Sequence, residues 1–155
     1  MELIKAGDIA PNFTLKDNHD ESVTLSDYRG KKVLLSWHPL AWTSVCTDQM
    51  RALEANWARF EALNTVPIGL SVDPRPSKKA WGAVLSIRNV RLPSDFWPHG
   101  QVADMYGILV EKIGVSERAN ILIDENGKVI WVKVYPSSQL PDIEEVFRQI
   151  TASKA

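Results

Sequence analysis

A lone cysteine is the residue of this chain best placed to do chemistry. Cys46 follows an apolar run, Val33–Trp37, and lies near the start of a helical pattern that begins at about Ser44. The first turn of a helix offers unpaired backbone N–H groups and the positive end of the helix dipole, and both stabilise a thiolate. Free cysteines are also common as small buried apolar residues, so position alone leaves both interpretations open.

The spacing around this cysteine favours a reactive thiol. Pro39, Thr43 and Cys46 form the pattern proline, three residues, threonine, two residues, cysteine. Each residue alone has an ordinary explanation, because threonine often caps helices and proline often ends strands. Together, between a buried strand and a helix, they resemble the active-site motif of the peroxiredoxins. These are thiol peroxidases built on a thioredoxin-like fold.

The resemblance extends from about Ile4 to Ile150. The segments Gly7–Phe13 and Leu25–Lys31 are similar to the opening of peroxiredoxins, and Ser94–Gly107 looks closest to the alkyl hydroperoxide reductase E group. Two positions depart from the family pattern. His38 stands where the family usually has an aromatic residue, and Gln49 stands where many members carry a glutamate.

The resemblance also implies a set of site residues. Thr43 can donate to a peroxide oxygen or accept from its O–H, and Pro39 can shield the thiol without adding a donor. Arg118 matches the arginine that faces the cysteine in peroxiredoxins and can stabilise both the thiolate and the departing oxygen. Without the resemblance, a surface arginine would be the simpler interpretation. The remaining candidates are the Val45 N–H, Gln49, Trp42 and Trp81, and core packing is the default for the two tryptophans.

These residues together predict a one-cysteine peroxidase. Cys46 attacks a peroxide and becomes a sulfenic acid, and an external thiol reduces it because the chain has no second cysteine. That thiol could be thioredoxin, glutaredoxin or a low-molecular-weight thiol. The alternatives are a redox sensor that passes oxidation to a partner protein and a cysteine hydrolase with His38 as base. Metal binding and Cys-X-X-Cys disulfide exchange lack the residues they need.

Composition excludes several other classes. The 155 residues suit a single domain, 1–155, with 45% hydrophobic and 24% charged residues. A net charge of −1 implies neither a nucleic-acid nor a membrane partner. We expect no cofactor and no metal. With no signal-peptide pattern, we expect a cytoplasmic protein, and the resemblance implies a homodimer.

Periodicity predicts the elements that must position the cysteine. The apolar run before it suits a central strand, and Ser44 to about Leu63 has a helical pattern. Pro67–Val72 is the next strand, which completes a right-handed strand-helix-strand unit. The outer elements are an N-terminal hairpin (about 13–25), a helix capped by Ser77, a short helix (98–106), a hairpin (120–134) and a last helix after Pro141. This order predicts a thioredoxin-like α/β fold with a central mixed sheet flanked by helices.

Overall fold

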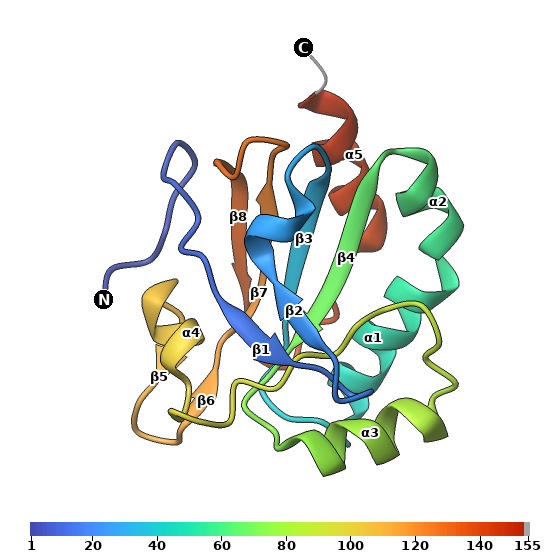
Figure 1. Ribbon diagram of the computed structural model, residues 1–155, viewed down its shortest axis with the longest axis vertical. Coiled ribbons are helices and arrows are strands. Elements are labelled where there is room, and N and C mark those ends of the chain that lie inside the picture. The colour runs from blue at the N-terminus through green and yellow to red at the C-terminus, as the bar shows by residue number, and fades with distance from the viewer. Residues whose placement is uncertain (154–155) are drawn as a thin grey trace.

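The computed structural model of the chain describes residues 1–153 and shows a central sheet between two layers (Figure 1). In chain order the elements are β1 (Thr14–Lys16), β2 (Ser22–Thr24), the 3₁₀ turn η1 (Leu25–Tyr28), β3 (Lys32–Trp37), α1 (Ser44–Ala55), α2 (Trp57–Ala62), β4 (Thr65–Leu70), α3 (Arg75–Val84), α4 (Gln101–Met105), β5 (Leu109–Val110), β6 (Val115–Ser116), β7 (Arg118–Ile123), β8 (Val129–Tyr135) and α5 (Ile143–Ala152). The central sheet has the strand order β4-β3-β7-β8.

Strand β3 occupies the middle of this sheet, and every one of its residues is buried. A strand covered on both faces needs a continuous apolar run, which is what Val33–Trp37 largely supplies. β3 pairs in parallel with β4 and antiparallel with β7. The predicted strand-helix-strand unit, the hairpin of β7 with β8 and the N-terminal hairpin of β1 with β2 are therefore confirmed.

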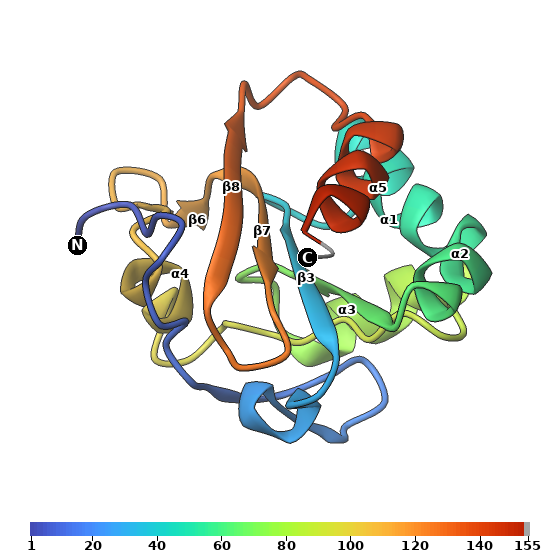
Figure 2. The same ribbon diagram turned by 90° about the horizontal axis from the view of Figure 1, so that it is seen from above.

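The two faces of the sheet carry separate apolar clusters. Leu34 of β3 and Leu122 of β7 point into a cluster with α1, α2, α5 and Trp81 of α3. Val33 and Leu35 point the other way, toward the N-terminal segment and α4. Figure 2 shows these two layers on opposite sides of the strands. Among residues 1–153, no helix is long and apolar enough to cross a lipid bilayer.

The helix predicted from Ser44 to about Leu63 is two helices. Asn56 separates α1 from α2, with φ −104° and ψ 15°. Its side-chain amide donates to the Ala52 carbonyl at 2.8 Å. Asparagine competes in this way for backbone partners and so favours helix ends, a local effect that the apolar period does not reveal.

Helix α3 begins before the position we predicted. Ser77 does not cap it, because the N-cap is Pro74 and the first helical residue is Arg75. Proline is favoured in a first helical turn, since an N–H there would lack a partner, and Pro76 occupies such a position. The strands β5 and β6 were not predicted, because two residues cannot show a period of two.

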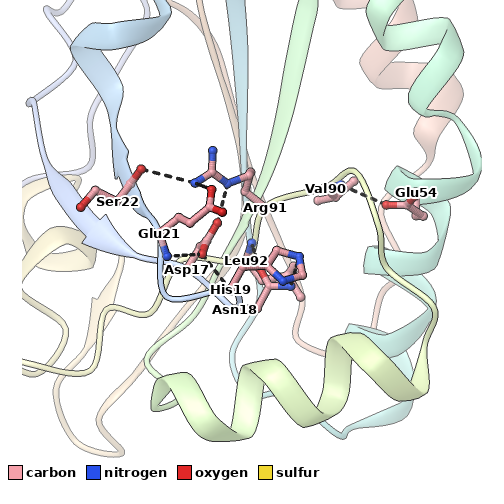
Figure 3. Close-up of polar contacts among 9 residues, drawn as sticks. All are labelled: Asp17, Asn18, His19, Glu21, Ser22, Glu54, Val90, Arg91 and Leu92. Carbon is pink, nitrogen blue, oxygen red and sulfur yellow. Dashed lines mark hydrogen bonds and ion pairs between the residues drawn. The ribbon is translucent and has the colours of Figure 1, made fainter.

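Polar side chains tie the turn between β1 and β2 to the segment after α3 (Figure 3). The Asp17 carboxylate accepts a hydrogen bond from the Arg91 guanidinium, and Asn18 accepts one from the Leu92 N–H at 3.0 Å. Glu54 of α1 accepts from two backbone N–H groups of the same segment. These contacts fix the path of residues 89–92, and the chain that follows contacts the loop after β4.

Candidate active site

Buried polar side chains lie on the face of the sheet that α1 covers. Successive strand residues point to opposite faces, and Leu34 points toward the helices. Ser36 and His38 follow it at intervals of two and share that face. Asn120 of β7 pairs with Ser36 of β3. Arg118 lies two residues before Asn120 on the same strand, so its side chain points to the same face of the sheet. The fold thus gathers a serine, a histidine and an arginine beneath the first turn of α1.

Cys46 lies in that first turn, and its side chain points toward these residues of the sheet. It is 1% exposed and belongs to the apolar cluster that contains Leu34 and Met50. Nη1 of Arg118 donates to the Cys46 Sγ at 3.3 Å. A guanidinium is always charged, and a hydrogen bond from it favours the anionic form of sulfur. The structure therefore brings together two predicted site residues that are 72 positions apart.

Arg118 is held by acceptors on two sides, the buried amide of Gln49 and the carbonyl of the exposed Ser137. Its Nη1 also donates to Gln49 Oε1 at 2.7 Å, and its Nε and Nη2 donate to the Ser137 carbonyl at 3.1 and 2.7 Å. Gln49 Nε2 donates in turn to the Ser36 hydroxyl at 2.8 Å and to the Trp37 carbonyl at 3.1 Å. An amide can accept from the guanidinium and donate to the strand at once. Gln49 therefore orients Arg118 without adding a charge.

Replacing Gln49 by leucine is expected to lower the free energy of unfolding by about 1–3 kcal/mol. The substitution removes the amide acceptor of Arg118 and the amide donor to Trp37 in a buried site. Urea denaturation of both proteins measures the difference. Gln139→Leu, in an exposed turn, is the matched control and should change stability by less than about 0.5 kcal/mol. Equal effects of the two substitutions would contradict the buried role of Gln49.

The other motif residues lie around the first turn of α1. Thr43 is its N-cap residue, and the Thr43 hydroxyl donates to the Leu40 carbonyl at 2.9 Å. Its proton is thereby engaged, so the oxygen is left to accept. Val45 lies in the first turn, where backbone N–H groups have no partner within the helix. Pro39 and Arg118 line a pocket of about 320 Å³, which reaches the arginine from solvent.

The two tryptophans named as site residues have different environments. Trp42 is 53% exposed, and its indole donates to the Ser77 hydroxyl at 3.0 Å. Trp81 is 1% exposed, donates to the Thr47 hydroxyl at 3.3 Å and packs on the His38 ring with a centroid distance of 5.2 Å. Trp81 thus belongs to the buried wall behind the site, and Trp42 presents its surface to solvent.

His38 has no hydrogen bond to Cys46 among residues 1–153. It is fully buried, and its Nε2 lies 3.4 Å from Nζ of Lys78. Burial, and then the charges of Lys78 and Arg118, hold the pKa of His38 well below its ordinary value, so the ring is neutral. The geometry therefore gives no support to a hydrolase in which His38 activates the cysteine.

A buried lysine next to this histidine was not predicted from the sequence. Lys78 lies three residues before Trp81 on α3, so both side chains face the sheet, and Lys78 is 0% exposed. Its Nζ donates to the Ser71 hydroxyl at 2.8 Å and to the Gly69 carbonyl at 3.4 Å. Burial lowers the pKa of Lys78 to about 7 against the opposing charge of Asp73. The signal that could have revealed it is a lysine on the tryptophan face of a helix.

The lowered pKa of Lys78 predicts a stability that rises with pH. In the folded protein the amine loses its proton near pH 7, whereas the unfolded chain keeps it up to about 10.5. The unfolded state therefore binds more protons between these values, so raising the pH favours the folded state. Relative to Lys78→Met, the unfolding free energy of the wild type should rise by up to about 1.4 kcal/mol per pH unit in this window. Urea denaturation at several pH values in this window measures the two free energies. If the amine did not titrate, the difference between the wild type and Lys78→Met would stay constant.

Comparisons with known proteins point to the same chemistry. Residues 6–132 match the AhpC/TSA family. The chain is 36% identical over 141 residues to alkyl hydroperoxide reductase E of Mycobacterium tuberculosis, with 90% of this chain and 92% of that protein covered. It is 35% identical over 135 residues to peroxiredoxin Bcp of Escherichia coli, with 83% and 85% covered.

A solved structure agrees as well. The reduced 2-Cys peroxiredoxin of Plasmodium vivax superposes with a TM-score of 0.85 at 31% identity, covering 95% of this chain and 80% of that one. The predicted thioredoxin-like α/β fold is confirmed by this similarity together with the mixed central sheet. The chain therefore belongs to the AhpC/TSA family, and with its single cysteine it is a thiol-dependent peroxidase of the one-cysteine peroxiredoxin type.

Proposed function

We propose that Cys46 is the nucleophile with which this peroxidase reduces hydrogen peroxide and organic hydroperoxides. The observation that carries the proposal is the 3.3 Å hydrogen bond from Arg118 Nη1 to the Cys46 Sγ, which sets a permanent positive charge beside the only cysteine sulfur. The thiolate forms a bond to one peroxide oxygen as the O–O bond breaks. The departing oxygen takes a proton from solvent and leaves as water or an alcohol, and Cys46 becomes a sulfenic acid.

Ionisation of the thiol supplies only a small part of the rate. An ordinary thiol is already about 3% ionised at pH 7, so complete ionisation gains at most about thirtyfold. The larger part must come from aligning the peroxide and stabilising the departing oxygen. Arg118 and the free N–H of Val45 are the donors for that oxygen. The Thr43 hydroxyl, which already donates to Leu40, accepts from the O–H of the peroxide.

An external thiol completes the cycle. It attacks the sulfenic sulfur of Cys46, water leaves, and a mixed disulfide forms. A second thiol then breaks that disulfide and releases the Cys46 thiol. Thioredoxin, glutaredoxin and low-molecular-weight thiols all supply this chemistry, and all are held reduced in the cytoplasm, where we place the protein.

We also propose that the peroxidase acts as a homodimer. Three large side chains are exposed on the loops around the site: Trp42 at 53%, Phe96 at 46% and Trp97 at 79%. Phe96 and Trp97 border a pocket together with Pro74, the N-cap of α3, and Pro76 of its first turn. Exposed aromatic groups of this kind favour burial in a protein contact.

Rapid mixing of the full chain with peroxides tests the proposed function. Tryptophan fluorescence follows the oxidation of Cys46, because Trp81 packs in the same cluster. Hydrogen peroxide and an alkyl hydroperoxide should each give a second-order fluorescence change and add one oxygen atom to the chain. Thioredoxin, glutaredoxin and a small thiol are then added in turn, and one of them should restore the starting signal. No oxidation by any peroxide would contradict the proposal.

A further inference from the structure

Behind the cysteine lies a buried cation that the reaction described so far does not use. We propose that Lys78 is a positioning residue of the peroxidase site, whose ammonium group acts through Ser71 and Asp73 to fix the turn that carries Pro39 and Thr43. This inference rests on the proposed peroxidase function of Cys46. It identifies the group that holds the turn with Pro39 and Thr43 in a fixed position relative to the Cys46 sulfur.

The ammonium group of Lys78 fits a cage of three acceptors. Ser71 Oγ lies at 2.8 Å, and the Gly69 carbonyl and His38 Nε2 each lie at 3.4 Å. An ammonium group has three protons and no lone pair, so it can satisfy all three acceptors at once. A neutral amine has only two protons to donate and would leave one acceptor without a partner. With the His38 ring proton on Nδ1, which leaves Nε2 as an acceptor beside the cation, all three contacts are made only when the amine is charged.

A chain of hydrogen bonds leads from this cage to the active-site turn. The Ser71 hydroxyl, which accepts from Lys78, donates to Asp73 Oδ2 at 2.6 Å. The same carboxylate oxygen accepts the backbone N–H of Ala41 at 2.8 Å. Successive hydrogen bonds of this kind polarise and strengthen one another in a buried site. The charge on Lys78 is thus linked, through Ser71 and Asp73, to the backbone between Pro39 and Thr43.

The turn needs such an anchor because its backbone is unfavourable. Trp42 has φ 73°, in the left-handed region that side chains with a Cβ rarely adopt. A conformation of that kind costs about 1–3 kcal/mol and persists only where the surroundings hold it. The bond from the Ala41 N–H to Asp73 holds the residue directly before it, and the Thr43 hydroxyl holds the residue after it.

The charges around Lys78 come from several elements. Asp73 lies on the loop after β4, Cys46 on α1 and Asp95 on the segment before α4, and all three favour the charged amine. Burial raises the pKa of Asp95 to about 6, although it accepts the N–H groups at the start of α4. On the remaining side lies the neutral His38, which also faces Arg118. The lowered pKa of Lys78 makes its charge dependent on pH near neutrality.

The test compares Lys78→Met with the matched control Lys79→Met, which changes the exposed neighbour. Stopped-flow fluorescence gives the rate constant for Cys46 oxidation by hydrogen peroxide. At about pH 6, where wild-type Lys78 is charged, Lys78→Met should be about tenfold slower than the wild type. At about pH 9 the difference should shrink to less than about twofold. Lys79→Met should match the wild type throughout, and a wild-type to Lys78→Met ratio independent of pH would overturn the proposal.

A second variant tests the link without removing the charge. Ser71→Ala keeps Lys78 but breaks the bridge to Asp73, so it should lose about as much rate at about pH 6. This arm decides the matter if Lys78→Met does not fold, and a Ser71→Ala rate equal to that of the wild type overturns the proposal. The wild-type chain is measured first. Peroxide oxidation of the wild type together with unaffected variants contradicts the role of Lys78 and leaves the peroxidase function intact.

Discussion

Cys46→Ser is expected to abolish peroxide reduction. A serine hydroxyl is almost wholly protonated at neutral pH and has no sulfur on which an oxygen could be placed. Serine is close to cysteine in size, and the Arg118 Nη1 that donates to the sulfur can donate to its oxygen instead. We therefore expect a folded protein in which the nucleophile alone is missing.

Peroxide consumption in the presence of a thiol reductant measures this loss, and mass spectrometry reports whether an oxygen atom is added. Met50→Leu is the matched control, because Met50 supplies the other sulfur in the same buried cluster. It should retain turnover, since a thioether cannot form a sulfenic acid. Turnover retained by Cys46→Ser would remove the cysteine from the mechanism, and turnover lost in both variants would point to a general packing defect.

The strands of the central sheet could be predicted because each is bounded by turn residues, and β3, β4 and β7 are almost wholly buried while β8 is partly buried. The hairpin of β7 with β8 follows from Asp124 to Gly127, where aspartate and glycine permit the tight turn. The boundaries of the helices were harder to predict from the sequence. The break at Asn56 depends on one side chain that competes for a backbone carbonyl, and it leaves the apolar period of the segment almost unchanged.

The site was predictable to a different degree at each residue. Cys46 and Thr43 are close in sequence, so their spacing is informative. Arg118 could be paired with Cys46 only through the family resemblance, because strand register brings together positions far apart in the chain. Lys78 was missed because helical lysines normally lie in solvent. Its acceptors lie at the ends of β3 and β4, which local spacing does not connect.

Arg118 makes three kinds of contact that a smaller cation could not make together. Its Nη1 donates to both the Cys46 sulfur and Gln49, while its Nε and Nη2 donate to the Ser137 carbonyl. The planar fork is therefore fixed before peroxide arrives, so no reorganisation is needed as charge builds on the departing oxygen. The position of the guanidinium, and not its charge alone, should govern the rate.

Arg118→Ala is accordingly expected to slow the oxidation of Cys46 by hydrogen peroxide by about 10²–10³-fold. Arg118→Lys should recover only part of the loss, since an ammonium group keeps the charge but lacks the fork. Stopped-flow fluorescence measures the rate constant, with Arg51→Ala on the exposed face of α1 as the matched control. Circular dichroism establishes that each variant is folded. A folded Arg118→Ala protein with the wild-type rate would exclude the guanidinium from peroxide activation, whereas full recovery in Arg118→Lys would show that charge alone suffices.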